Sequence, residues 1–391
     1  MKNKVEILVK GLKEELIELS EFIYHNPELG YKEFKSCKAH VDILKKHGFH
    51  VEENFLGIDT AFRAEYKGEK EGPTIAYLSE YDALPEIGHG CGHNLLGTVS
   101  TGSGIILSKL IDKIGGKVVV LGTPAEETSG AKVIMADKGA FNDVDVALIA
   151  HPAGEYYKSG SSKALEPIQF TFRGKSAHAS AAPEQGINAL DAVILTFNAI
   201  NALREHIKPS AKIHGIIKRG GEAANIVPDL AIAQFYVRAA TKNYLNELSE
   251  KVKKCAKGAS LATGTKLKIE KYELGYDNLI TNNNLQGTFI KNLNKVGIKN
   301  INEPLFSSGS TDVGNVSQVC PAIHPSFGIC EEGKTFPAHT IEFAEATLTD
   351  IAYYNMAKTI SALVLTGVDI ITDKELLNKI KEEHKLAIAV S

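Results

Sequence analysis

The stretch that decides the fold is TIAYLSEYDALPEIGHGCGHNLLG, residues 74–97. It opens on a short apolar run, 74–78, in which apolar and polar residues do not alternate, as is typical of a strand buried on both faces. A glycine-rich loop with acidic, histidine and cysteine side chains follows, and residues 95–111 have the pattern of a helix. A buried strand, a polar loop and a helix in this order indicate a β-α unit of a mostly parallel sheet.

The same rhythm of strand and helix extends on both sides of this stretch. An amphipathic helix is predicted over 5–23, where apolar residues recur every three or four positions. Two more β-branched apolar runs, 118–121 and 144–149, predict buried parallel strands, and 131–139 predicts a helix between them. The fold class is therefore α/β, with a mostly parallel sheet.

The pattern changes in the middle of the chain. Residues 166–273 read as strand, helix, two strands, helix and strand, which is the order of a ferredoxin-like α+β unit. We therefore expect a discontinuous α/β domain, residues 1–163 and 276–391, with an inserted ferredoxin-like domain, residues 164–275.

Composition excludes several classes of protein. The 391 residues are 43% hydrophobic and 23% charged, which fits a folded chain of about two domains rather than a disordered one. Lys and Arg number 44 against 47 Asp and Glu, so we expect no nucleic-acid partner and no membrane partner. No apolar run has the length of a membrane span. The charged N-terminal segment and five scattered cysteines predict a cytoplasmic protein with reduced thiols.

Chemically active side chains follow three successive predicted strands. Ligands of open α/β sheets bind beyond the carboxyl ends of the strands, so these positions are the ones that matter. The residues found there are Glu80, Asp82, His89, Cys91 and His93 after the first strand, Glu126 and Glu127 after the second, and His151 after the third. Each of them alone has an ordinary structural explanation, and only their convergence on one sheet edge predicts a shared metal site.

This set of side chains suits metal-assisted hydrolysis. Cysteine sulfur and histidine nitrogen are ligands for zinc and related ions, and carboxylate oxygens can bridge or complete the site. The spacing of Cys91 and His93 can direct both side chains to one face of an extended loop. In the pair Glu126-Glu127, one carboxylate can bind metal while the other takes a proton from metal-bound water, whose pKa falls to about 7 on a zinc-like ion.

Seven segments together resemble the M20 family of metallopeptidases. They are YDALPEIGHGCGHN, GTPAEE, the His-Pro pair at 151–152, GKSAHAS, NIVPD, SSGSTDVGNVS and FPAHT, and they occur in order along essentially the whole chain. The resemblance is to the amidohydrolase subfamily with a Gly-Cys-Gly-His loop, and within it to the branch of aminobenzoyl-glutamate hydrolase subunits and Xaa-Arg dipeptidases. One departure stands out, because Glu80-Tyr81-Asp82 occupies the place of a His-x-Asp motif that many members carry.

The resemblance implies roles for individual residues. The implied metal ligands are Cys91, His93, Glu127, His151 and His339, and we expect them to hold two divalent ions of zinc or manganese type, with one ion as the alternative that the departure at Glu80-Tyr81-Asp82 leaves open. Glu126 is implied as general base and later general acid, and Asp82 as the carboxylate that orients a ligand. His178 is implied to stabilise the oxyanion of the scissile carbonyl, in many relatives in the neighbouring subunit, so a homodimer through the inserted domain is expected. The implied substrate-binding residues are Asn225, Arg238, Gly309 and Ser310.

The leading hypothesis is a metal-dependent hydrolase that cleaves an amide bond next to a free carboxylate. Metal-bound hydroxide would attack a dipeptide, an N-acyl amino acid or an aminobenzoyl-glutamate-like substrate, with Glu126 as base, and the inserted domain would act as a lid. Two alternatives remain at this stage. One is a cysteine-dependent hydrolase with Cys91 as nucleophile and His93 as its base. The other is a metal-binding subunit of a hydrolase assembly.

Overall fold

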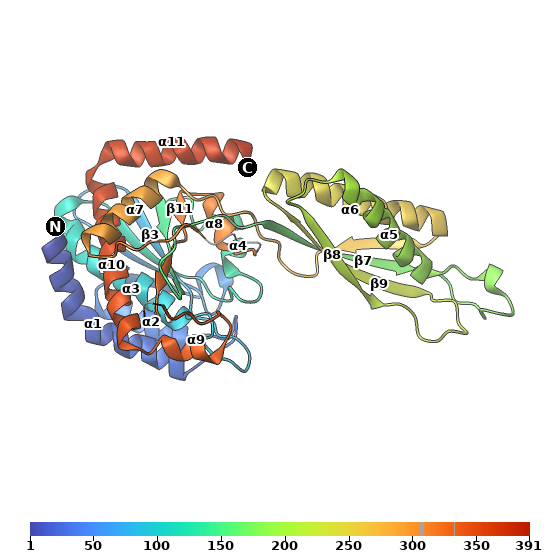
Figure 1. Cartoon of the computed structure of the whole chain (residues 1–391), viewed down its shortest axis with the longest axis horizontal. Helices are drawn as coiled ribbons and strands as arrows, with labels where there is room; N and C mark the ends of the chain where they lie inside the picture. The colour runs from blue at the N-terminus through green and yellow to red at the C-terminus, as the bar shows by residue number, and fades with distance from the viewer. Residues whose placement is uncertain (305–308, 332) are drawn as a thin grey trace. The chain divides into compact units, whose positions relative to one another are not determined.

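A six-stranded sheet is built from strands that lie far apart in the sequence. In the computed structural model, residues 1–304, 309–331 and 333–391 are described. They divide into two units: unit 1 is Met1–Ser161 with Leu279–Val390, and unit 2 is Ser162–Asn278 with Ser391 (Figure 1). The sheet belongs to unit 1, and its last strand comes from the segment that follows unit 2 in the sequence.

The strands of this sheet lie in the order β1-β2-β4-β3-β5-β11. Their bounds are His50–Glu53 (β1), Phe62–Lys67 (β2), Thr74–Ser79 (β3), Lys117–Gly122 (β4), Val146–Leu148 (β5) and Ala322–Ile323 (β11). The last four in this order run parallel, and β1 and β2 pair antiparallel at one edge. The predicted parallel-rich α/β fold is confirmed. The antiparallel edge escaped the sequence analysis because β1 and β2 are partly exposed and lack an apolar run.

Both faces of the sheet are buried, as the apolar strands require. Along β3, Ile75 and Tyr77 enter one core and Ala76 and Leu78 enter the other, because successive side chains of a strand point to opposite faces. The first core contains residues of α1 (Lys2–His25), α2 (Phe34–Lys46), α3 (His93–Ile114), α7 (Asn283–Lys295), α9 (Ile341–Ala346) and α10 (Asp350–Thr372). The second contains residues of α4 (Ala131–Asp137) and α8 (Val313–Ser317). Polar loops can therefore converge at the carboxyl ends of the parallel strands, between these two layers.

Unit 2 has the strand and helix order of a ferredoxin-like fold, which confirms that prediction. Its elements are β7 (Ala164–Arg173), α5 (Ala189–Leu203), β8 (Lys212–Arg219), β9 (Leu230–Ala239), α6 (Lys242–Thr263) and β10 (Lys266–Glu270). The sheet is antiparallel in the order β10-β7-β9-β8. The helix α5 begins after Asn188, because the Asn188 side chain accepts from the amides of Leu190 and Asp191 and so caps the helix there.

The strands β6 (His151–Ala153) and β12 (Ser326–Gly328) form a two-stranded parallel sheet. In the sequence, β6 follows shortly after β5 and β12 shortly after β11. The remaining elements are the short 3₁₀ turns η1 (Phe55–Gly57), η2 (Pro183–Gln185) and η3 (Arg204–His206), and α11 (Lys374–Val390). None of the helices in the described part of the chain has the length and apolar content needed to cross a membrane.

Candidate active site and metal centre

Ligand atoms from four loops of unit 1 gather at the sheet edge. Three groups of side chains each bring their ligand atoms within 4.8 Å of one another: Cys91, His93 and His151; Cys91, Glu127 and His339; and His93, Glu126 and Glu127. All five expected ligands take part, and Cys91 is shared by two groups. His93 and Glu127 are likewise each shared by two groups, and this set of sulfur, nitrogen and oxygen donors fits divalent metal.

Asp82 contacts two of these residues at once, one through its side chain and the other through its backbone amide. Its Oδ1 lies 3.0 Å from His93 Nδ1, which also lies 3.0 Å from the Asp82 carbonyl oxygen. Both neighbours can only accept, so Nδ1 carries a proton and Nε2 is the ring nitrogen that can bind a cation. The second oxygen, Oδ2, accepts from the Glu127 amide at 2.9 Å. Asp82 therefore connects the loop after β3 to the loop after β4.

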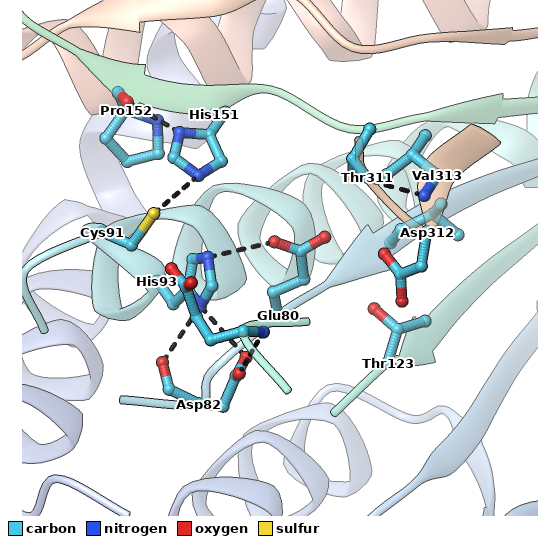
Figure 2. A network of polar contacts seen from close by, with 12 residues as sticks. Glu80, Asp82, Cys91, His93, Thr123, His151, Pro152, Thr311, Asp312 and Val313 are labelled. Carbon is cyan, nitrogen blue, oxygen red and sulfur yellow. Dashed lines mark hydrogen bonds and ion pairs between the residues drawn. The ribbon is translucent and has the colours of Figure 1, made fainter. Parts of the chain in front are cut away.

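Cys91 and His151 face each other across the site, as Figure 2 shows. Cys91 Sγ lies 3.4 Å from His151 Nε2, and His151 Nδ1 donates to the Pro152 carbonyl at 2.7 Å, which leaves Nε2 unprotonated. The expectation of an extended Cys91–His93 loop is wrong: Gly92 has φ 77° and α3 begins at His93. Glycine adopts this left-handed conformation without strain, and the resulting turn of the chain brings the side chains of Cys91 and His93 into the site.

His339 reaches the site from the far end of the sequence. Its amide donates to the Gly90 carbonyl at 2.8 Å, which ties the FPAHT segment to the loop that carries Cys91. Its Nε2 lies 3.4 Å from Glu127 Oε1. The backbone φ of His339 is 66°, an unfavourable value for a residue with a Cβ. Such strain persists only where the surroundings hold it, and it is often found at functional sites.

Two polar atoms that make no hydrogen bond in the described part of the chain, although each has an ionisable neighbour at 3.3–3.4 Å, mark where a cation fits. Within the described residues, His93 Nε2 and Glu127 Oε1 are buried and have no hydrogen-bond partner. Buried polar atoms normally find a partner, so these two fit the ligand role. Burial also raises the pKa of the Cys91 thiol. A divalent cation would favour the thiolate, because cation binding displaces the proton.

Glu126 directly precedes Glu127 in the sequence and belongs to the same group of possible ligands around His93. Desolvation, followed by the negative charges of Glu80 and Asp312, raises the pKa of Glu126 well above its usual value. A raised pKa favours proton uptake by this carboxyl group, which is what a general base that later acts as an acid requires.

A buried ion cluster lies behind the ligands and was not anticipated. Lys132 Nζ is 2.7 Å from Glu80 Oε1 and 2.8 Å from Asp312 Oδ1, and all three side chains are fully buried. Glu80 Oε2 lies 3.3 Å from His93 Nε2, and Figure 2 shows Glu80 between His93 and Asp312. Burial acts to raise the pKa of Glu80, but the positive charges of Lys132, His93, His324 and His151 together outweigh it and lower the value to about 2. A single lysine within the apolar segment AKVIM was the available signal.

His324 is another residue near the site that sequence reasoning left aside. Its ring centroid lies 5.7 Å from that of His151, and its Nε2 is buried without a hydrogen-bond partner in the described residues. It directly follows β11, so the rule applied to the first three strands would have found it had β11 been recognised.

Unit 2 carries three of the expected functional residues. His178 is exposed, and its Nδ1 accepts from the amides of Ser180 and Ala181 at 3.3 Å. The Asn225 carbonyl accepts from the Ala179 amide at 3.0 Å, so the His178 loop and the Asn225 turn are adjacent. Arg238 lies on β9 with its Nε 3.4 Å from His214 Nε2. The structure thus brings His178 and Asn225 together within unit 2.

The remaining two, Gly309 and Ser310, belong to unit 1 and precede Asp312 in the sequence. The motif SSGSTDVGNVS starts at Ser307, and its first two residues lie outside the described part of the chain.

Comparison with known proteins gives this arrangement a family. Residues 165–263 match a peptidase dimerisation domain. The chain is 36% identical to the Xaa-Arg dipeptidase of Mus musculus, over 98% of this chain and 92% of that protein. It is 28% identical to one of the subunits of the p-aminobenzoyl-glutamate hydrolase of Escherichia coli K12, over 97% of this chain and 94% of that protein.

Solved structures share the fold. A dinuclear metal binding peptidase of the M20 family from Bacillus subtilis superposes with a TM-score of 0.69 at 20% identity, covering 92% of this chain and 99% of that one. An aminobenzoyl-glutamate utilization protein from Klebsiella pneumoniae gives a TM-score of 0.72 at 19% identity, covering 92% and 97%. The chain is thus a two-unit α/β hydrolase acting on amide bonds. It belongs to the M20 family of peptidases, as the sequence motifs predicted.

Proposed function

We propose that this protein hydrolyses an amide bond adjacent to a free carboxylate, with two divalent ions of zinc or manganese type in unit 1. The observation that supports this most is the convergence of Cys91, His93, Glu127, His151 and His339 in two groups that share Cys91. Substrates of this class are dipeptides, N-acyl amino acids and aminobenzoyl-glutamate-like conjugates. The names of the relatives fall within this range.

Bound divalent ions supply Lewis acidity, which polarises the scissile carbonyl and makes a water molecule more acidic. The protein does the rest through placed side chains. Glu126 takes the proton of the attacking water and delivers it to the nitrogen of the leaving amine. Asp82 keeps His93 in the tautomer whose Nε2 faces the site.

Unit 2 supplies the groups that recognise substrate in this proposal. His178 donates a hydrogen bond to the developing oxyanion, and Asn225 and Arg238 hold the carbonyl or carboxylate of the substrate. An arginine suits a carboxylate because its planar group can donate to both oxygens. Gly309 and Ser310 line the pocket of unit 1.

The match to a peptidase dimerisation domain supports a homodimer formed through unit 2. The five cysteines, free throughout the described residues, support a reducing, cytoplasmic compartment.

The test combines one substitution with a broad substrate panel. Protein loaded with Mn²⁺ or Zn²⁺ is incubated with a mixture of dipeptides, acyl amino acids and aminobenzoyl-glutamate, and products are identified by mass spectrometry. We expect Glu126→Gln to lower kcat by about 10³-fold or more while bound metal per chain stays unchanged. Full activity in this variant would place the base elsewhere. Metal binding without hydrolysis of any panel member would favour the subunit of a larger assembly.

The cysteine-nucleophile alternative has less support from the geometry. A nucleophilic thiol needs a lowered pKa, whereas burial raises the pKa of Cys91. The nitrogen of His93 that would serve as base also lies 3.3 Å from Glu80 Oε2.

A further inference from the structure

The loop that carries Glu126 and Glu127 is held by a turn from the N-terminal region. Glu33 Oε1 accepts the amide of Ala125 at 2.8 Å, and Oε2 accepts the hydroxyl of Thr60 at 2.8 Å. Glu33 is fully buried and Thr60 almost so. A carboxylate enclosed in this way has no solvent to share its hydrogen bonds, so it specifies the positions of the groups that donate to it.

The residue that Glu33 holds has an unusual backbone conformation. Ala125 has φ 64°, in the left-handed region that alanine avoids. It immediately precedes Glu126, so this dihedral sets the direction in which the Glu126-Glu127 pair leaves β4. A conformation that is unfavourable in itself must be maintained by neighbouring contacts. The hydrogen bond from the Ala125 amide to Glu33 is such a contact.

The neighbours of Glu33 also fit closely against this loop. A Cβ on Gly30 would lie 2.9 Å from Ala125 Cβ and 2.5 Å from Thr128 Oγ1, so only glycine allows the turn to approach this closely. The Tyr31 hydroxyl donates to the Ser129 carbonyl at 3.1 Å. On the other side of Glu126, Asp82 accepts the Glu127 amide. The backbone is therefore fixed immediately before and immediately after Glu126.

Glu33 does not serve the helix that it begins. It occupies the N-cap position of α2, but its side chain makes no capping hydrogen bond. The free amides at this end are bound instead by Glu28, whose carboxylate accepts from Lys35 N at 2.9 Å and from Ser36 N at 2.9 Å. The two acidic residues at one helix end thus have separate tasks, since one caps the helix and the other binds the loop with Glu126.

We infer that Glu33 is a positioning residue for the reaction: by holding the Ala125 amide, it keeps the left-handed turn that aims Glu126 at the substrate. The inference rests on the proposed role of Glu126 as base. Burial, and then the charge of Asp82, raise the pKa of Glu33 to about 7. Both the neutral and the ionised group can accept from Ala125, so a neutral amide at this position can replace it.

Three variants test the inference. Glu33→Ala removes the acceptor. Glu33→Gln keeps an oxygen that can accept from the Ala125 amide, and its side-chain N–H can donate to the Thr60 hydroxyl. Glu28→Ala is the matched control at the same helix end. We expect Glu33→Ala to lower kcat by about 10- to 100-fold with KM and bound metal unchanged, because small displacements of a catalytic group have effects of this size. Glu33→Gln should stay within about threefold of wild type. Glu28→Ala should lose stability through the lost cap and keep kcat.

Hydrogen exchange provides a readout that does not depend on activity. Peptides covering residues 123–130 should exchange faster in Glu33→Ala than in wild type, and at the wild-type rate in Glu33→Gln and Glu28→Ala. Unchanged exchange in Glu33→Ala, or a kcat within twofold of wild type, would overturn the inference. If Glu33→Ala does not fold, Glu33→Asp replaces it. Its shorter side chain should give the same loss, and wild-type kcat and exchange in Glu33→Asp would count against the inference. If exchange is faster in Glu33→Ala but Glu126→Gln remains active, the proposed function is refuted. The role of Glu33 in holding the loop would still stand in that case.

Discussion

Replacement of Lys132 by methionine tests whether the buried ion cluster stabilises unit 1. The ammonium lies 2.7 Å from Glu80 and 2.8 Å from Asp312, with no exposed surface on any of the three side chains. Methionine has a similar length and no charge, so the change removes the cation with little change in volume. It leaves two carboxylates facing each other in a site without solvent.

The expected loss in the free energy of unfolding is about 3–5 kcal/mol, because that is the usual effect of removing one partner of a buried ion pair. Protonation of one carboxyl limits the loss. The pKa of Asp312 is raised to about 6 even with Lys132 present: burial is the main cause, and Glu80 adds to it. Without the ammonium it would rise further. The loss should therefore be smaller at pH 6 than at pH 8.

Urea unfolding followed by far-UV circular dichroism measures this effect, since the chain has no tryptophan to report by fluorescence. Lys109→Met is the matched control: Lys109 lies on α3 in the same unit with its side chain exposed, and its replacement should change stability by less than about 0.5 kcal/mol. The triple variant Glu80→Gln, Lys132→Met, Asp312→Asn removes all three charges and should recover much of the loss. If Lys132→Met unfolds like Lys109→Met, the cluster has no net stabilising role.

Three more outcomes follow from the site. Removal of divalent ions with a chelator should abolish activity, and Mn²⁺ or Zn²⁺ should restore it; activity that survives chelation and is lost only on thiol alkylation would support a cysteine nucleophile. Inactive variants at Glu126 and His178 should regain activity when mixed as heterodimers if the site is shared between subunits, and failure to complement would place both residues in one chain's site. The raised pKa of Glu33, about 7 against its usual 4.5, favours the protonated folded state. The contribution of Glu33 to stability should therefore fall as pH rises from about 5 to 8, so Glu33→Gln should be more stable than wild type at pH 8 by up to about 3 kcal/mol in urea unfolding. Parallel pH curves of the two proteins would contradict this.

Much of the fold was visible in the sequence because burial on both faces leaves a local signature. The apolar runs that became β3 and β4 contain no polar position to face solvent, and the strand and helix order of unit 2 is local as well. The antiparallel strands β1 and β2 were missed because their side chains are partly exposed. An edge strand has fewer apolar neighbours, so its sequence is less constrained.

The residues that take part in the candidate site were found in two different ways. Cys91, His93, Glu126 and Glu127 follow predicted strands, so the topology of a parallel sheet was enough to bring them together. His339 was proposed only through the family resemblance, because nothing local distinguishes it from other histidines. Only the folded chain places it 3.4 Å from Glu127, which lies 212 positions earlier in the sequence.

Side-chain composition and local periodicity thus indicated by themselves which long apolar segments are buried, in what order they occur and which of them precede candidate metal ligands. The tertiary structure alone decided which acid holds which amide, as with Glu33 and Ala125, and which carboxylates Lys132 neutralises. The physical reason is that apolar burial depends on a segment's own pattern, whereas hydrogen bonds and ion pairs act over about 3 Å and depend on where distant segments meet.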